Sequence, residues 1–473
     1  KNTLIQQKKL QMKLSKIKHI HFIGAGGVGM IGIAEMLLNQ GYKISGSDIL
    51  ESKNTRRLKE KGAKVFIGHN TNNIKGADVI VYSSAVSDRN PEIVQAKKDN
   101  KIIIPRAEML SSLMKKYQSI AVAGSHGKTT TTSMIASTFS DADLDPTFIV
   151  GGRIMGKEDS SILGKSDYLI VEADESDGTF MHLNPEMSVL TNIDNDHLDF
   201  YDNNQTKLEQ TFYEFLEKIP FSGTAVICTD EIKAKKVFKK LSRQKISYGF
   251  KKGAIYQIGN LIQTSNNQTF EILDTILKKS YKLTLKIPGK HNALNAAAAF
   301  IVSKISGIST KLIINSLKKF SGVKRRLELK GNIKLNNKEV MLFDDYGHHP
   351  TEIEATIDAL KNTYSDKKIF MVFQPHRYSR SMALFDEFIK ILSKVDVLIM
   401  LDIYSAGEQN HKNISSYDFL NRLLAINSRC FFAKNIQDIK RNLEDHSAED
   451  HLIITQGAGN IAEISNSLFQ TLK

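Results

Sequence analysis

The stretch AVAGSHGKTTTT, Ala121–Thr132, has the form of a shortened phosphate-binding loop. The usual pattern would place a glycine at position 122, where this chain has valine. An apolar strand precedes the loop and a helix follows it, so backbone N–H groups and the positive helix end attract phosphate there. We expect ATP to bind here, with Lys128 at the β and γ oxygens and Thr129 on Mg²⁺. The loop residues expected to contact ATP are Gly124, Ser125, His126, Gly127, Lys128, Thr129 and Thr130.

Acidic clusters follow two apolar strands downstream of this loop. A phosphate loop needs an acid to hold its metal, and polar residues at the carboxyl ends of parallel strands meet at the ligand-binding edge. The segment TNIDNDH offers Asp194, Asp196 and His197. The segment VEADESD offers Glu172, Asp174, Glu175 and Asp177. From these we expect Glu172 and His197, with Thr129, to be the metal ligands.

Nearer the N-terminus, GAGGVG has Gly24, Gly26 and Gly29 in the spacing of a dinucleotide-binding turn between a strand and a helix. Glycines let backbone N–H groups approach a diphosphate at a helix N-terminus. Asp48 ends the second strand, where an acid commonly binds a ribose hydroxyl. The turn therefore predicts a nucleotide ligand, and taken alone it leaves the nucleotide open, NAD included.

Strands alternate with helices along all 473 residues, which predicts parallel sheets flanked by helices. We expect an α/β fold of three domains over residues 1–118, 119–322 and 323–473. The first and last would be Rossmann-like and the central one like a phosphate-loop ATPase. Residues 245–286 resemble an antiparallel β insertion.

Polar residues gather at strand ends in the last third of the chain. Arg377 and Arg380 suit carboxylate recognition, because guanidinium binds carboxylate through two bonds. His291, Asn292 and Asn295 begin an alanine-rich helix and could bond a base edge. The crowded strand-end residues are Asp344, Asp345, Tyr346, His348, His349, His376, Arg377 and Arg380.

The formal net charge of +14 raises the possibility of nucleic-acid binding. The excess is mostly lysine scattered along helix faces, with no nucleic-acid motif and no tryptophan, so anionic small molecules are the better prediction. No apolar run is long enough to span a bilayer. We expect a cytoplasmic protein, a monomer or homodimer, without nucleic-acid or membrane partners.

The ordered motifs resemble those of the Mur ligase family from about Ile20 to Ala462. They are GAGGVGM, GSHGKTTTT, EADESD, TNIDNDH, HNALNA, GVKRR, DDYGHHPTE, QPHRYSR and DIYSAGE. Ser125 and Ser379 stand where the family often has threonine. The resemblance implies that the glycine turn receives the diphosphate of a UDP-sugar in place of NAD.

The resemblance further implies an ATP-dependent ligase of peptidoglycan synthesis, joining L-alanine to the lactyl carboxylate of UDP-N-acetylmuramate through an acyl phosphate. The alternatives are a paralogue that attaches a recycled tripeptide, an NAD-dependent oxidoreductase and a nucleotide switch. DDYGHHP together with QPHRYSR favours the alanine reaction.

Site residues follow from the same resemblance. The catalytic residues expected are Lys128, His197, His348, Arg377 and Arg380. Beyond the phosphate loop, those expected to contact ATP are His291, Asn292, Asn295 and Arg326. Those expected to contact the substrates are Gly24, Ala25, Gly26, Gly27, Val28, Gly29, Asp48, Tyr346, His348, His376, Arg377 and Arg380.

Overall fold

The computed structural model describes residues 17–83, 85–151, 154–155, 161–176, 178–196, 198, 200–202, 204–265, 267–411, 413–427, 429–446 and 450–472. These residues form two compact units. The first unit contains the described residues within 1–153, 157–248 and 301–308. The second contains those within 154–156, 249–300 and 309–473. Among the described helices, none combines the length and the apolar character needed to cross a membrane.

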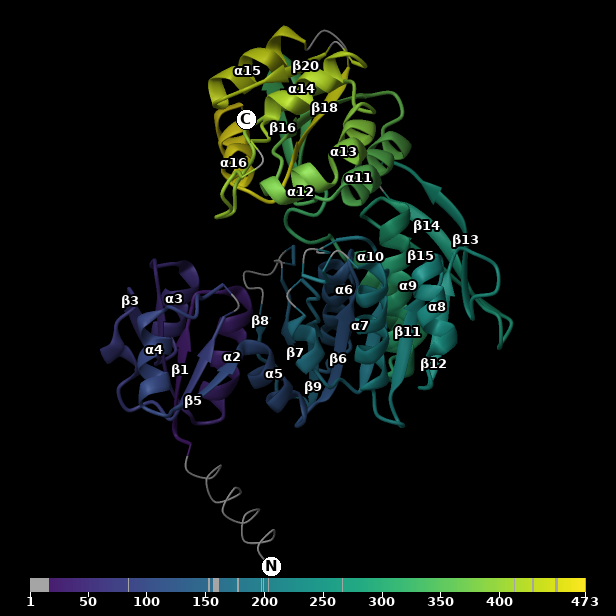
Figure 1. The fold of residues 1–473 in the computed structure, drawn as a ribbon. Coiled ribbons are helices and arrows are strands. Elements are labelled where there is room, and N and C mark those ends of the chain that lie inside the picture. The colour runs from purple at the N-terminus through teal and green to yellow at the C-terminus, as the bar shows by residue number, and fades with distance from the viewer. Residues whose placement is uncertain are drawn as a thin grey trace, which may run out of the picture. The chain divides into compact units, whose positions relative to one another are not determined.

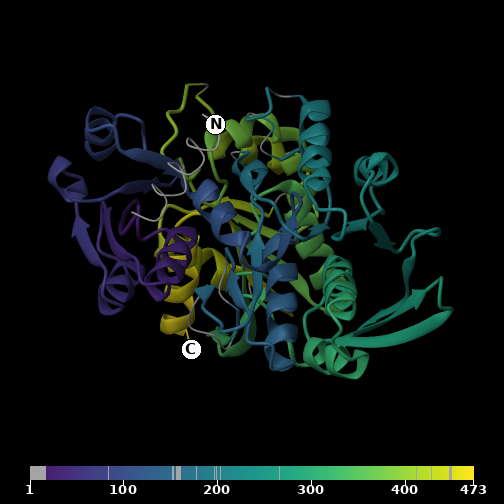
Figure 2. The same ribbon diagram turned by 90° about the horizontal axis from the view of Figure 1, so that it is seen from below.

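The first unit begins with a five-stranded parallel sheet (Figure 1 and Figure 2). Its strands are β1 (His19–Ile23), β2 (Lys43–Asp48), β3 (Lys64–Ile67), β4 (Val79–Tyr82) and β5 (Ile102–Pro105), in the order β3-β2-β1-β4-β5. The helical segments are α2 (Val28–Asn39), α3 (Lys53–Glu60), η1 (Thr71–Ile74), α4 (Pro91–Lys98) and α5 (Arg106–Met114). Because side chains alternate along β1, Ile20 and Phe22 pack with α2 and α5, whereas Ile23 packs with α4.

The same unit holds a second, largely parallel sheet. Its strands are β6 (Gln118–Ala123), β7 (Thr147–Ile149), β8 (Ser161–Ile162), β9 (Tyr168–Glu172), β10 (Met187–Leu190), β11 (Thr224–Cys228) and β12 (Lys245–Gly249). They run in the order β12-β11-β10-β6-β9-β7-β8, and β8 alone is antiparallel to its neighbour in that series. The helical segments are α6 (Lys128–Asp141), η2 (Thr179–His182), α7 (Gln205–Glu217) and α8 (Ile232–Lys240). Because β6 lies between β9 and β10, the loops after these three strands emerge side by side.

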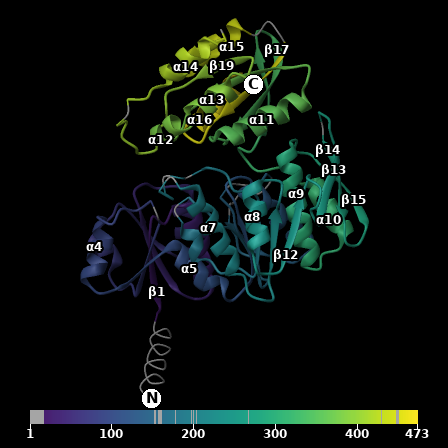
Figure 3. The ribbon, with the colours of Figure 1, turned by 45° about the vertical axis from the view of Figure 1, so that its right-hand side comes forward.

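Three antiparallel strands in the second unit confirm most of the expected insertion. They are β13 (Tyr256–Gln263), β14 (Gln268–Asp274) and β15 (Lys279–Leu285), which lie side by side in Figure 3. The predicted start of the insertion is wrong, because β12 pairs in parallel with β11 and so continues the parallel strands before it. Two helices follow, α9 (Lys290–Ile305) and α10 (Thr310–Lys319).

The second unit ends in a six-stranded sheet of order β16-β17-β21-β18-β19-β20. The strands are β16 (Glu328–Leu335), β17 (Lys338–Asp345), β18 (Lys368–Phe373), β19 (Val397–Met400), β20 (Cys430–Phe432) and β21 (His451–Gln456). The helices are α11 (Pro350–Thr363), α12 (Tyr378–Ala383), α13 (Phe385–Leu392), α14 (Ser416–Leu424), α15 (Ile436–Asp445) and α16 (Ile461–Leu472). Only β16 runs antiparallel, to β17, so the prediction of a largely parallel sheet is confirmed.

Candidate functional site

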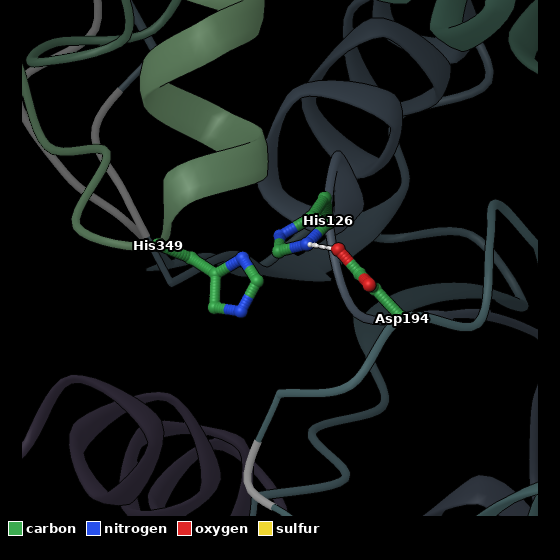
Figure 4. Close-up of side chains that lie close together, drawn as sticks. All are labelled: His126, Asp194 and His349. Atoms are coloured by element: carbon green, nitrogen blue, oxygen red, sulfur yellow. Dashed lines mark hydrogen bonds and ion pairs between the residues drawn. The ribbon is translucent and has the colours of Figure 1, made fainter. Parts of the chain in front are cut away.

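The loop between β6 and α6 is held in place by the loop that follows β10. Thr191 Oγ1 donates to the His126 carbonyl at 2.6 Å, and the His126 N–H donates to Asn192 Oδ1 at 2.8 Å. The Asp194 N–H donates to Ser125 Oγ at 2.9 Å. His126 Nε2 lies 2.8 Å from Asp194 Oδ2, as Figure 4 shows. The GSHG and TNID motifs therefore act as one structural element.

Two glycines give this loop its conformation. Gly124 has φ +130°, and a Cβ there would lie 2.1 Å from Thr191 Oγ1. Gly127, with φ +83°, is the N-cap of α6 and provides no side-chain cap. The first N–H groups of α6 thus remain available to an anion, as phosphate binding at a helix N-terminus requires.

Lys128 is tied to the loop and to a buried carboxylate. Its Nζ donates to the carbonyls of Gly124 at 2.7 Å and Ser125 at 3.2 Å, and to Glu175 Oε2 at 2.7 Å. Burial opposes the charge on Lys128, but the nearby carboxylates, Glu175 foremost, outweigh it and raise the pKa of the lysine. An ammonium has three N–H donors, so a phosphate can bind Lys128 only by replacing one of these contacts.

The described part of the expected metal site consists of Thr129 and Glu172. Thr129 is buried in the first turn of α6. Glu172 ends β9 opposite Val122, directly beside the strand that leads into the loop. A Cβ on Gly151 would lie 2.6 Å from Glu172 Oε2, so glycine keeps that space open. A hydroxyl and a carboxylate are oxygen donors that fit Mg²⁺. The remaining predicted ligand, His197, lies outside the described residues.

The glycine turn is held by hydrogen bonds to the last two residues of β2. The N–H groups of Gly24 and Ala25 donate to the Ser47 carbonyl at 2.9 and 3.0 Å. Asp48 Oδ2 accepts from the Gly26 N–H at 2.8 Å. Asp48 therefore fixes the turn, a role that the sequence did not indicate, while its contact with a ribose stays a prediction. Gly27 is the N-cap of α2 and has no side-chain cap, so N–H groups at this helix end remain available to an anion.

Arg326 and His348 contact Glu352 in the second unit, and Tyr346 packs against Arg326. Arg326 Nη1 donates to Glu352 Oε1 at 3.1 Å, and the His348 N–H donates to Glu352 Oε2 at 3.0 Å. The Arg326 guanidinium lies 5.2 Å from the Tyr346 ring centroid. Glu352 follows DDYGHHP in the sequence and lies in the first turn of α11, where the motif alone does not predict its two partners.

Asp345 organises the chain around this group. It accepts from the N–H groups of Leu327 at 2.6 Å and Gly347 at 2.8 Å, and from Gln456 Nε2 at 2.7 Å. Its charge also acts on His291, where burial lowers the imidazole pKa and Asp345 partly offsets that effect. Arg326 also acts on His291, so the two residues lie in one electrostatic neighbourhood, and their contact with ATP stays a prediction.

Asn292 and Asn295 lie together at the start of α9. Asn292 Nδ2 donates to the Pro288 carbonyl at 2.6 Å, and Asn295 Nδ2 donates to Asn292 Oδ1 at 3.3 Å. Both side chains are buried. Their bonds stabilise the first turns of the helix, and their predicted contact with adenine or ribose stays a prediction.

His376 and Arg377 lie in the turn between β18 and α12, and Arg380 lies within α12. Arg380 Nη1 donates to His376 Nδ1 at 3.4 Å, and the His376 ring stacks on Tyr404 at a centroid distance of 5.6 Å. Burial, followed by Arg380 and Arg377, lowers the pKa of His376 to about 4. Arg377 has φ +70°, and its Nε lies 4.0 Å from Glu408 Oε1. The turn therefore presents a neutral imidazole beside two cations.

The fold is of the α/β class with a loop of phosphate-binding form after β6, and the comparisons with known families divide its two compact units into three domains. Three family descriptions match consecutive segments: the Mur ligase family catalytic domain over residues 19–118, the Mur ligase middle domain over 122–303 and the Mur ligase glutamate ligase domain over 325–459. The chain belongs to the Mur ligase family, the ligases that build peptidoglycan precursors.

Solved structures of the family are similar over almost the whole chain. The UDP-N-acetylmuramate–alanine ligase of Thermotoga maritima is 26% identical with a TM-score of 0.79, covering 96% of this chain and 98% of that one. A murein peptide ligase of Psychrobacter arcticus is 22% identical with a TM-score of 0.69, with the same coverages of 96% and 98%. A ligase of Thermotoga maritima solved with ADP is 15% identical with a TM-score of 0.61, covering 91% and 94%.

Proposed function

We propose that this ligase joins L-alanine to the lactyl carboxylate of UDP-N-acetylmuramate, using ATP, in the cytoplasm. The observation that carries the proposal is the loop around Lys128, whose ammonium lies at the uncapped start of α6. That arrangement suits the β and γ phosphates of ATP. The similarity to the alanine ligase of Thermotoga maritima supports this choice of substrates. We also propose domain boundaries at residues 118 and 322.

The chemistry requires activation, because a carboxylate is a poor electrophile toward an amine. Phosphorylation of the lactyl carboxylate by ATP gives an acyl phosphate, which the alanine amine attacks with release of phosphate. Lys128 would compensate the charge that develops on the transferred phosphoryl group. Thr129 and Glu172, with His197, would hold Mg²⁺, which neutralises phosphate charge when bound.

The glycine turn would receive the UDP diphosphate on the N–H groups at the start of α2. His291, Asn292, Asn295 and Arg326 would position adenine or ribose. Arg377 and Arg380 would bind a carboxylate, of alanine or of the acceptor, and their guanidinium groups suit that task. The neutral His376 beside them can accept a hydrogen bond without adding charge.

A second candidate is the ligase that attaches a tripeptide to the same UDP-sugar. The similarity to the murein peptide ligase of Psychrobacter arcticus over 96% of this chain supports this second candidate. The two reactions share ATP chemistry and the acceptor, so they differ only in the amine.

The test is phosphate release with Mg·ATP, UDP-N-acetylmuramate and L-alanine, each omitted in turn. Release that needs all three, with an amide product of the expected mass, would support the proposal. Release with a tripeptide but not with alanine would support the second candidate. Release that ignores the UDP-sugar would refute both.

A further inference from the structure

A buried polar cluster lies on the α4 face of the first sheet, and the proposed chemistry does not use it. It consists of His19, His21, Ser45, Ser47 and Glu92, each buried. The apolar residues Ile23, Ile80 and Ile93 form the core of this face. A carboxylate and two imidazoles in such surroundings need compensating partners.

The cluster forms a continuous chain of hydrogen bonds. His19 Nδ1 lies 2.9 Å from the Gly76 carbonyl oxygen, and His19 Nε2 lies 2.8 Å from Ser45 Oγ. His21 Nδ1 lies 2.8 Å from the same Ser45 Oγ, and His21 Nε2 lies 3.3 Å from Glu92 Oε2. The chain therefore begins at a carbonyl, which accepts only, and ends at a carboxyl group.

Each of these contacts requires one proton between its two heavy atoms. Neutral His19, neutral His21 and the Ser45 hydroxyl supply one proton each, which leaves one contact without a proton. Every arrangement that satisfies the whole chain adds one proton, on His19, on His21 or on the carboxyl group of Glu92.

Glu92 receives three hydrogen bonds besides its contact with His21, and these favour the carboxylate over the neutral acid. Ser47 Oγ donates to its Oε2 at 2.6 Å, and Asn73 Nδ2 and the Asn70 N–H donate to its Oε1 at 2.6 and 3.1 Å. Burial favours protonation, but the hydrogen bonds from His21, Ser47 and Asn73 outweigh it and hold the pKa of Glu92 below its usual range. These contacts favour the ionised form of Glu92, which leaves the added proton to one of the two imidazoles.

Of the two imidazoles, His21 is the better place for the charge. Burial lowers the pKa of His19; the hydrogen bond to the Gly76 carbonyl and the charge of Asp78 only partly offset that effect, and Lys43 adds to it. His21 contacts the carboxylate directly and faces the Phe66 ring, over which Lys64 lies. His69 approaches Glu92 from the other side, its Nδ1 3.7 Å from Oε1 and 3.1 Å from Ser47 Oγ.

We infer that His21 is a buried imidazolium paired with Glu92, and that this pair positions Ser47 and, through it, the glycine turn. Ser47 bonds Glu92 with its hydroxyl and receives the N–H groups of Gly24 and Ala25 on its carbonyl. His21 and Glu92 are positioning residues: they act on the diphosphate of the UDP-sugar through Ser47. This effect on the substrate rests on the proposed function, whereas the charge of the pair does not.

The charge is tested by NMR on the full-length protein labelled with ¹⁵N-histidine, at pH 8. An exposed imidazole, with a pKa of about 6.5, is neutral at that pH. We expect one imidazole to retain both ring protons, and His21→Gln to remove its signals. A spectrum in which every imidazole is neutral at pH 8 would overturn the inference.

The positioning role is tested with Glu92→Gln and Ser47→Ala in the assay of phosphate release. Glu92→Gln should abolish the imidazolium signal and raise the KM for UDP-N-acetylmuramate about tenfold, with kcat changed by less than about twofold. Ser47→Ala should raise the same KM and keep the signal, which also covers the case that Glu92→Gln fails to fold. Glu108→Gln, exposed on α5, is the matched control.

A KM left unchanged by Ser47→Ala would refute the positioning role. An enzyme that ignores the UDP-sugar, yet shows the imidazolium, would refute the proposed function and leave the buried pair established. The two failures are therefore distinguishable.

Discussion

The Lys128–Glu175 pair couples activity to stability at the scale of single residues. Both side chains are largely buried, so removing the lysine leaves a carboxylate without its partner. We predict that Lys128→Met lowers phosphate release at least about 100-fold, because the charge that we propose Lys128 compensates on the transferred phosphoryl group would stay uncompensated. The same substitution should lower the free energy of unfolding by about 3 kcal/mol, measured by urea titration.

Adding Glu175→Gln separates the two effects. The double variant Lys128→Met/Glu175→Gln should recover most of the lost stability, because the buried negative charge is gone, and it should remain inactive. Lys98→Ala, exposed in α4, serves as the control. A double variant no more stable than Lys128→Met would show that the pair is not the source of the stability.

His376 should make the stability depend on pH. Its pKa is about 4 in the folded chain, because burial and then Arg380 and Arg377 disfavour the imidazolium. An unfolded imidazole titrates near about 6.5, so between these values the unfolded state binds more protons. The neutral, buried His376 therefore contributes to the free energy of unfolding above about pH 6.5, and this contribution is lost as pH falls toward 4.

The measurement is urea unfolding between pH 4 and 6.5. His376→Asn should become more stable relative to the wild type as pH falls, by at most about 3 kcal/mol. His411→Asn, at an exposed histidine, is the control: its difference in unfolding free energy from the wild type should not change with pH. Parallel pH profiles for His376→Asn and the wild type would contradict the prediction.

At the scale of elements, the conformation of the loop after β6 depends on how closely it packs against the loop after β10. A Cβ at position 124 would lie 2.1 Å from Thr191 Oγ1 and 3.0 Å from the Asn192 backbone. Gly41 also has positive φ, at +86°, but has nothing within 4 Å. Gly124→Ala should therefore cost about 1–3 kcal/mol more than Gly41→Ala and should weaken ATP binding, because the loop must move.

Calorimetric titration of ATP into both variants checks this prediction. Gly41→Ala shares the left-handed backbone strain but not the steric clash, so it should bind ATP as the wild type does. Equal ATP affinity in Gly124→Ala and Gly41→Ala would mean that the Thr191 contact does not shape the loop.

The sequence predicts those elements in which an apolar strand runs into glycines or polar residues, such as β6 before Gly124 and β1 before Gly24. It does not predict β16, whose residues ELKGNIKL are half exposed and weakly apolar. The consecutive asparagines Asn336 and Asn337 were a signal for a turn. Both have positive φ, at 47° and 65°, as a tight hairpin turn between β16 and β17 requires.

Which side chains bond one another within the site is harder to predict than the helices and strands on which they lie. Glu172, Asp174 and Glu175 share one segment, and only the turn after β9 decides which of them meets Lys128. The bonds of His21 with Ser45 and Glu92 join three elements. No residue spacing indicates such a cluster, because its members are united by burial in three dimensions.

At the scale of the whole molecule, the net charge of +14 has a consequence for substrate capture. A positive field raises the local concentration of anions, and salt screens it, with a Debye length of about 10 Å at 0.1 M and 3 Å at 1 M. Of the proposed substrates, ATP and UDP-N-acetylmuramate are anions, whereas L-alanine is a zwitterion with no net charge. Raising the salt from 0.05 to 0.5 M should therefore increase the KM of both nucleotides severalfold and leave that of alanine nearly unchanged.

Steady-state kinetics with each substrate varied in turn makes this comparison within one enzyme, so alanine is its own control. A general effect of salt on the fold would act on all three KM values or on kcat. If the KM of alanine rises as much as those of the nucleotides, the excess of lysine and arginine has no part in capturing the substrates. A selective rise would give the basic composition a role without any nucleic acid, because the two anionic substrates would then be the molecules that the positive charge attracts.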